Sequence, residues 1–120
     1  MNQIFHSKSC STNQRILKEW QATDDFNFCD IKTEGISETE LDYLATLAGS
    51  YEALFSRVAR KYRLMNLHEA VLTEADYRRL MLEEYTFMKR PIAVVNDQIF
   101  IGNAPKTVAA AKQAIMSYEL

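Results

Sequence analysis

The 120 residues of this chain suffice for one domain with a buried core and are too few for two. Its 48% hydrophobic and 25% charged residues are typical of a globular protein, and its net charge of -2 gives no general attraction to DNA. No apolar run approaches the ~20 residues of a membrane span, and the N-terminus lacks signal-peptide features. With two cysteines, we therefore expect a cytoplasmic protein with reduced thiols and no membrane partner.

The chain begins with a short strand that leads through a polar turn into a helix. Gln3–His6 is predicted as the strand and Ser7–Asn13 as the turn, and apolar residues recur at helical spacing after Gln14. Cys10 therefore falls at or near the first turn of the helix. Unpaired N–H groups and the positive end of the helix dipole stabilise a thiolate there, so Cys10 is the candidate nucleophile.

A second strand and a well-marked helix follow. Phe26–Ile31 alternates aromatic and polar residues, as in a strand, and Cys29 within it is interpreted as a small structural hydrophobe. Ser37 and Glu40 form a capping box at the start of a helix that Gly49 ends. The chain from here to the final hairpin is predicted to be helical.

Two further helices are predicted in this part of the chain. One runs over about 50–64, with an apolar face made of Leu54, Phe55, Val58 and Tyr62. The other begins at Thr73 and turns Tyr77, Leu80, Met81 and Tyr85 inward. In the first helix, Arg57, Arg60 and Arg63 follow at i, i+3 spacing and share a face. That face is either simply solvated or binds an anion.

The last part of the chain changes from helical to strand patterning. Pro91–Val95 and Gln98–Ile101 are short apolar runs joined by Asn96-Asp97, which predicts a hairpin, and a last helix covers about 106–118. The order is β-α-β, helical insert, β-hairpin and α. Periodicity alone gives an α/β or α+β class. With Cys10 at the strand–helix junction, the order predicts one thioredoxin-like domain over 1–120, with a four-stranded mixed sheet and an insert at about 37–88.

Two stretches together resemble the arsenate reductase family of the ArsC/Spx type. They are IFHSKSCSTNQRIL (residues 4–17) and KRPIAVVNDQIFIGN (residues 89–103). The resemblance implies that Cys10 is the nucleophile and that His6 is the histidine found four residues before it. It also implies that Arg90 is an oxyanion-binding arginine and that Pro91 is a cis-proline facing the cysteine.

Five positions depart from the family's motif. Ser7 and Lys8 stand where the family has Asn-Pro. Asn13 stands where it has serine or a second cysteine, Gln14 where it has arginine or lysine, and Asn103 where it has an arginine after Ile-Gly. Cys10 therefore has no partner of the CxxC kind, and an external thiol has to resolve any adduct that it forms. Two of the family's anion ligands are missing or displaced.

The candidate site gathers around Cys10. His6 either stabilises the thiolate as an imidazolium or is a polar core residue. The other candidates for tuning the thiolate are Ser11, Thr12 and Asn13 at the helix N-terminus. The candidates for binding an anion are Arg90, Arg57, Arg60, Arg15 and Lys8, because the family places an oxyanion-binding arginine in the insert. Two isolated histidines and two distant cysteines make no metal signature.

The resemblance implies a thiol-dependent oxidoreductase with no bound cofactor. Its substrate would be a small oxyanion, arsenate, or a mixed disulfide, and its reductant glutathione, glutaredoxin or thioredoxin. The alternative is a non-enzymatic regulator similar to Spx-type members, which bind RNA polymerase, or a module that binds another protein. Regulation would then rest on Cys10 alone or on no cysteine.

Overall fold

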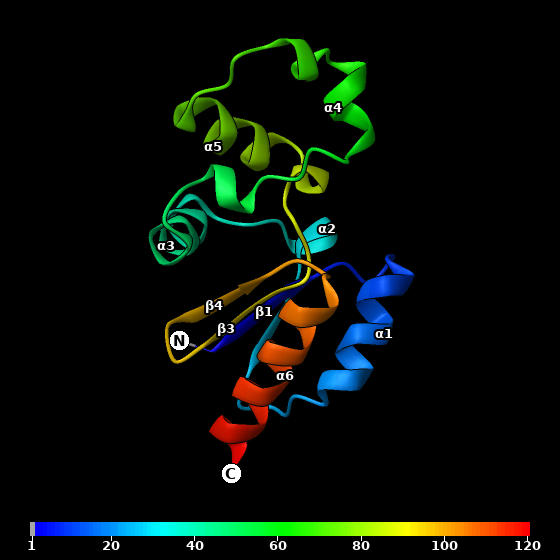
Figure 1. Ribbon diagram of the computed structural model, residues 1–120, viewed down its shortest axis with the longest axis vertical. Coiled ribbons are helices and arrows are strands. Elements are labelled where there is room, and N and C mark those ends of the chain that lie inside the picture. The colour runs from blue at the N-terminus through cyan, green and yellow to red at the C-terminus, as the bar shows by residue number, and fades with distance from the viewer. Residues whose placement is uncertain (1) are drawn as a thin grey trace. The chain divides into compact units, whose positions relative to one another are not determined.

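The computed structural model describes residues 2–120, which form two compact units (Figure 1). The first unit consists of the chain up to Gly35 and from Arg90 onward, and the second unit of Ile36–Lys89. Over the part of the chain that is described, no helix is long and apolar enough to cross a membrane.

The first unit is built on a four-stranded mixed sheet in the order β2-β1-β3-β4. The strands are β1 (Gln3–His6), β2 (Asn27–Asp30), β3 (Ile92–Val95) and β4 (Gln98–Ile101). β1 and β2 run parallel, while β3 is antiparallel to both β1 and β4. This confirms the predicted thioredoxin-like sheet. β2 is shorter than predicted because Ile31 already begins a helix.

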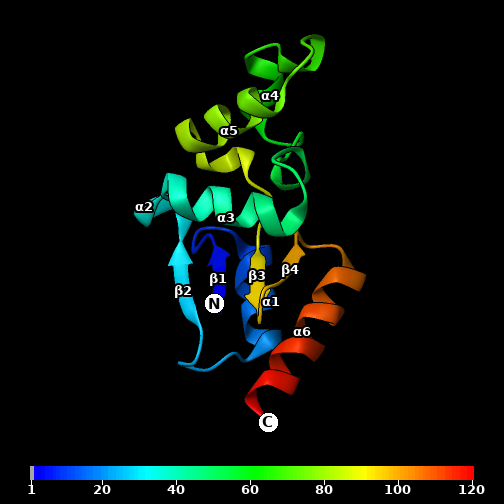
Figure 2. The same cartoon turned by 90° about the vertical axis from the view of Figure 1, so that its left-hand side faces the viewer.

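The strand register brings distant parts of the chain to one end of the sheet. His6 lies opposite Asp30, Phe5 opposite Ile92, and Ile92 opposite Ile101. Figure 2 shows the arrowheads of β1, β2 and β4 pointing to this end, and β3 running away from it. We call it the Cys10 end of the sheet, because the loop to Cys10 leaves β1 there.

Helices α1 (Ser11–Trp20) and α6 (Pro105–Glu119) pack together on one face of the sheet. Their apolar side chains join those of alternate strand residues in one buried core: Ile4, Ile16, Trp20, Phe26, Ala93, Val95, Val108, Ala111 and Ile115. The Trp20 indole N–H donates to the Val108 carbonyl at 3.0 Å, which satisfies its polar group inside the core. This core fixes the helix that presents Cys10.

Several boundaries in the first unit differ from the sequence-based prediction. α1 begins at Ser11, so the last residues of the predicted turn, Ser11–Asn13, are helical. A four-residue helix, α2 (Ile31–Glu34), follows β2. The hairpin is as predicted, because Asn96 and Asp97 have φ of 49° and 63°, the left-handed values that a two-residue turn of this kind requires.

The second unit contains three helices and three short 3₁₀ turns. They are α3 (Glu38–Ala48), η1 (Glu52–Leu54), α4 (Arg60–Leu64), η2 (Leu67–Glu69), α5 (Glu74–Glu83) and η3 (Tyr85–Phe87). The capping box predicted at Ser37 and Glu40 is present, and Thr73 caps α5 in the same way with Asp76. Tyr85 lies beyond α5, in η3.

The single helix predicted over 50–64 is wrong. The chain makes η1, becomes extended at Phe55, and is helical again only from Arg60. Phe55 forms a β-bridge with Met88, and the adjacent Ser56 N–H donates to the Phe87 carbonyl at 2.7 Å. This pairing with a segment more than thirty residues away satisfies the backbone and interrupts the helix. Val58, predicted on the apolar face, is 93% exposed.

Candidate functional site

Cys10 is the N-cap residue of α1. Its backbone is extended, its N–H donates to the Ser7 carbonyl at 3.1 Å, and its carbonyl accepts the Gln14 N–H at 3.0 Å. Because the helix starts immediately afterwards, the first N–H groups of α1 have no partner within the helix. No acidic side chain lies in the first turn. The positive end of the helix dipole is therefore left to stabilise a negative charge on the Cys10 sulfur.

Asn13 supports the same sulfur with a side-chain hydrogen bond. Its side chain is 1% exposed, and its Oδ1 accepts the Ser7 N–H at 3.0 Å. Since an oxygen must face that N–H, the amide nitrogen is turned toward Cys10, and Nδ2 lies 3.4 Å from Sγ. Asn13 thus occupies the position of a resolving cysteine and offers the thiolate a donor instead.

Gln14 is a part of the site that the sequence analysis missed. Its Nε2 lies 3.2 Å from the Lys8 carbonyl and 3.5 Å from the Ser7 carbonyl, so it joins α1 to the loop before Cys10. The one sign of this role in the sequence was a neutral amide at a position where the family has a cation. In the structure, the Gln14 side chain binds backbone carbonyls of the protein itself.

His6 lies at the end of β1 and is 4% exposed. Burial lowers the pKa of its imidazole, and Lys8 acts in the same direction, while the carboxylates of Asp30 and Glu34 oppose the shift. The ring is therefore mostly neutral near pH 7. Within residues 2–120, its Nδ1 has no hydrogen-bond partner.

Three cations of the first unit line a depression beside α1. A surface depression of about 530 Å³ is lined by Lys8, Ser9, Ser11, Gln14, Arg15 and Lys18. Its lining residues flank Cys10 in the chain and include three cations and no carboxylate. Two of these cations, Lys8 and Arg15, were candidates from the sequence, and Lys18 is an addition. The three cations favour an anion in the depression, although Cys10 itself is not among its lining residues.

Arg90 and Pro91 stand at the start of β3, at the Cys10 end of the sheet. The peptide bond between them is cis, and the Pro91 carbonyl accepts the Gly102 N–H at 2.9 Å. This bond places Asn103, the residue after Gly102, at the same end of the sheet. The two positions that carry arginines in the family's motif thus lie at the same end of the sheet, and one of them holds an asparagine in this chain.

The arginines of the insert are arranged differently from the prediction. Arg57 lies before α4, so Arg57, Arg60 and Arg63 do not share one helical face. The Arg57 guanidinium lies 2.7 Å from Glu52 Oε2 and 2.8 Å from the Tyr77 hydroxyl, and its hydrogen bond to Glu52 raises its pKa. Arg60 is exposed on α4. The Arg57 guanidinium therefore binds side chains of its own unit, those of Glu52 and Tyr77.

Residues 2–120 contain no metal cluster and no second cysteine beside Cys10. No group of three or more His, Cys, Asp or Glu residues that could hold a metal occurs in the described chain. Cys29, like Cys10, forms no disulfide, and its Sγ lies 3.5 Å from the Gly35 carbonyl. The site therefore has one candidate nucleophile.

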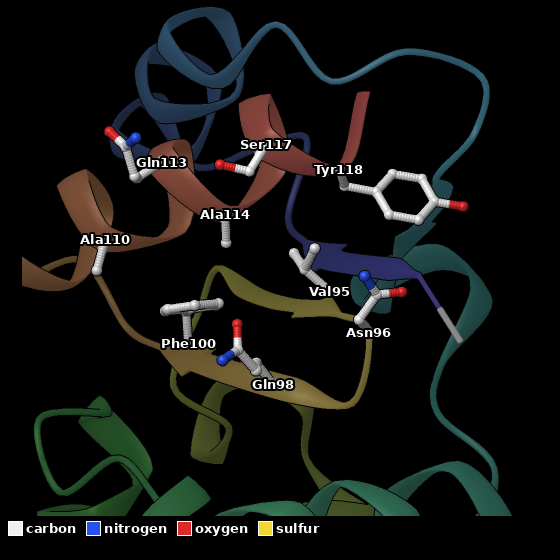
Figure 3. Close-up of a pocket in the computed structure, with 9 residues that line it drawn as sticks. All are labelled: Val95, Asn96, Gln98, Phe100, Ala110, Gln113, Ala114, Ser117 and Tyr118. Carbon is white, nitrogen blue, oxygen red and sulfur yellow. The ribbon is translucent and has the colours of Figure 1, made fainter. Parts of the chain in front are cut away.

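A second depression lies between β4 and α6 (Figure 3). Its volume is about 520 Å³, and it is lined by Val95, Asn96, Gln98, Phe100, Ala110, Gln113, Ala114, Ser117 and Tyr118. The lining contains no cysteine, histidine or charged side chain. It lacks the nucleophile and the cations that are found at the start of α1.

Comparison with known proteins places the chain in a family. The model of the ArsC family matches residues 5–111, which is most of the chain. The chain belongs to the ArsC family. No curated protein matches it.

Solved structures related to the ArsC family share its fold. The YFFB (PA3664) protein has a TM-score of 0.75 and 25% identity, over 92% of this chain and 98% of that one. The arsenate reductase from Vibrio cholerae has a TM-score of 0.75 and 23% identity, over 92% and 96%. An arsenate reductase (ArsC) related protein from Brucella melitensis has a TM-score of 0.69 and 24% identity, over 91% and 92%.

Proposed function

We propose that this ArsC-family protein is a thiol-dependent oxidoreductase with Cys10 as its nucleophile. The observation that carries the proposal is the double support of the Cys10 sulfur, by the N-terminus of α1 and by the amide of Asn13 at 3.4 Å. Both favour the thiolate, which is the form that attacks arsenic or a disulfide sulfur.

The family favours arsenate as the first substrate to test. In this reaction the Cys10 sulfur displaces one hydroxyl group of arsenate as water and forms a sulfur–arsenic bond. An external thiol then attacks Sγ and breaks that bond, and its electron pair leaves with arsenic as arsenite. A second external thiol reduces the resulting mixed disulfide and frees Cys10. Arsenic gains two electrons, and two thiols become one disulfide.

A mixed disulfide is the second substrate class, because Gln14 and Asn103 stand where the family binds the oxyanion. Cys10 would attack one sulfur of the disulfide, and the other sulfur would leave as a thiolate. An external thiol would then resolve the new disulfide. Glutathione, glutaredoxin or thioredoxin supplies the external thiol in either case.

The residues that bind the anion are proposed from their charge and their place in the fold. Lys8 and Arg15 line the depression at the start of α1, and Arg90 stands at the Cys10 end of the sheet. These cations favour a substrate that carries negative charge. Neither Cys10 nor Cys29 forms a disulfide, which suits a reducing compartment such as the cytoplasm.

The test is the pH dependence of Cys10 alkylation by iodoacetamide, measured in the Cys29→Ser background with and without arsenate. At pH 6 we expect iodoacetamide to alkylate Cys10 faster than free cysteine, and arsenate to protect Cys10. Glutathione-dependent turnover of arsenate should accompany this protection. Cys10→Ser should abolish turnover, whereas Cys29→Ser should retain it.

Two other outcomes redirect or overturn the proposal. Fast alkylation without arsenate protection would keep Cys10 as the nucleophile and make a mixed disulfide the substrate, to be tested with a glutathionylated peptide. Alkylation no faster than that of free cysteine, with no protection and no turnover, would overturn the enzymatic function. A non-enzymatic protein that binds a partner would then be the better interpretation.

A further inference from the structure

Asp30 is the one buried carboxylate at the Cys10 end of the sheet among the described residues. It ends β2, lies opposite His6 in the parallel pair, and is 4% exposed. A buried carboxylate is costly unless several donors satisfy it. The sequence analysis assigned Asp30 no role, although an aspartate between a strand and the next helix is a typical N-cap.

The carboxylate of Asp30 accepts hydrogen bonds from two separate parts of the chain. On one side, Oδ1 accepts the Lys32 N–H at 3.4 Å and Oδ2 accepts the Thr33 hydroxyl at 3.0 Å, which caps α2. On the other side, Oδ1 accepts the N–H of Lys8 at 3.3 Å. Lys8 belongs to the loop that leads to Cys10, so Asp30 joins this loop to β2 and α2.

These donors keep the Asp30 carboxyl ionised. Burial alone would raise its pKa, but the N–H of Lys8, the Thr33 hydroxyl and the N–H of Lys32 outweigh it. The nearby imidazole of His6 acts in the same direction as the donors, and the pKa lies below its ordinary value. The carboxylate is thus charged, and an acceptor for Lys8, throughout the physiological pH range.

The rest of the loop is held from the opposite side by α1. Asn13 accepts the Ser7 N–H, and Gln14 donates to the Lys8 carbonyl. The peptide groups around Lys8 therefore lie between two supports, one on the helix that carries the nucleophile and one on a neighbouring strand. The Asp30 carboxylate joins that strand to the loop, and its removal takes away this support on the strand side.

We propose that Asp30 is a positioning residue for Cys10, which acts through the Lys8 N–H to hold the loop that places the thiol at the N-cap of α1. This deepens the proposed function and rests on Cys10 being the nucleophile. The loop sets where Sγ lies relative to the free N–H groups of α1 and the Asn13 amide. Without the hydrogen bond from the Lys8 N–H to Asp30, the loop holds Sγ less firmly in place. The N–H groups of α1 and the Asn13 amide then stabilise the thiolate less.

The test compares Asp30→Asn with Asp30→Ala in the Cys29→Ser background. The two variants have the same charge, but only the asparagine keeps an oxygen that can accept from the Lys8 N–H. The readout is the pH profile of Cys10 alkylation by iodoacetamide. At pH 6, we expect alkylation to be about two- to tenfold slower in Asp30→Ala than in Asp30→Asn, the effect of one hydrogen bond.

Thr33→Val is the matched control. It removes a hydrogen bond from the same carboxylate on the α2 side and leaves the Lys8 contact in place. We expect its Cys10 profile to match that of the parent protein, although α2 is weakened. Equal profiles for Asp30→Ala and Asp30→Asn, or an equal shift in Thr33→Val, would overturn the positioning role.

A measurement on the protein with native Asp30 keeps the proposal testable even if Asp30→Ala does not fold. The Lys8 amide proton resonance should titrate with Asp30, at a midpoint below 3.8, the ordinary value for this carboxyl. A Lys8 amide resonance that does not change between pH 2 and 5 would overturn the proposal. These results do not depend on arsenate turnover, so they separate the failure of this inference from the failure of the proposed function.

Discussion

The two units of this protein use polar side chains in opposite ways. All four buried polar or charged residues of the described chain, His6, Ser7, Asn13 and Asp30, lie in the first unit, at the Cys10 end of the sheet. In the second unit the buried residues are hydrophobic, and its ion pairs lie nearer the surface, as between Arg57 and Glu52.

With Cys10 as the proposed nucleophile, the contrast separates residues that position it from residues that stabilise the fold. Burying a polar group costs free energy, and here the buried polar residues lie at the Cys10 end of the sheet. The second unit is held by packing: the Phe55 ring stacks on Phe87 at 5.1 Å and meets Tyr77 at 4.8 Å. Substitutions of the buried polar residues in the first unit should therefore change the reactivity of Cys10. Substitutions in the core of the second unit should change the free energy of unfolding.

The largest effect should come from the aromatic core of the second unit. Phe55 is fully buried, so Phe55→Ala leaves a cavity and should lower the free energy of unfolding by about 3–5 kcal/mol. Urea unfolding measures this change. Val58→Ala, at a position that is 93% exposed, is the control and should stay within about 0.5 kcal/mol. Similar losses in both variants would contradict the packing described for this unit.

The next effect should come from Asn13 and should appear as reactivity. Asn13→Ala removes the donor at 3.4 Å from Sγ, and a hydrogen bond to a charged group is worth about 1.5–3 kcal/mol. We expect Cys10 alkylation at pH 6 to slow by about ten- to a hundredfold. Gln113→Ala, which removes an exposed amide on α6, is the control and should leave the rate unchanged. An unaltered rate in Asn13→Ala would show that the amide does not support the thiolate.

A smaller effect should follow from the burial of His6. Its folded-state pKa is below 6.5, so between pH 7 and 5 the unfolded chain takes up a proton that the folded protein resists. The free energy of unfolding should therefore fall as the pH drops through this window. In His6→Gln the same pH change should cause a smaller loss, as measured by urea unfolding at pH 7 and pH 5. An equal loss in both proteins would rule out His6 as the source.

The smallest effect should come from the exposed arginines of the insert. Arg60 and Arg63 are exposed, so Arg60→Ala and Arg63→Ala should change the free energy of unfolding by less than about 0.5 kcal/mol. The same variants can be scored for arsenate protection of Cys10. A loss of protection without a loss of stability would assign the anion-binding role to that arginine. A larger loss of stability would mean that its side chain packs in the folded protein.

The features that the sequence predicted correctly either depend on residues close together in the chain or belong to a sequence motif. The capping box at Ser37 and Glu40 and the turn at Asn96-Asp97 depend on residues within a few positions of each other. The helix predicted over 50–64 failed because Phe55 pairs with Met88, a contact that periodicity does not contain. The role of Asp30 was missed for the same reason, since its partner Lys8 is 22 residues away.

The amide at position 13 has a consequence for the lifetime of any oxidised form of this protein. A second thiol at this place would release the adduct within the molecule, at a rate set by the fold. With Asn13 there, the adduct on Cys10 persists until a thiol arrives from solution. Its decay is then second order and depends on the concentration of that thiol. The fraction of the protein present as the adduct would therefore depend on the concentration of reduced thiol around it.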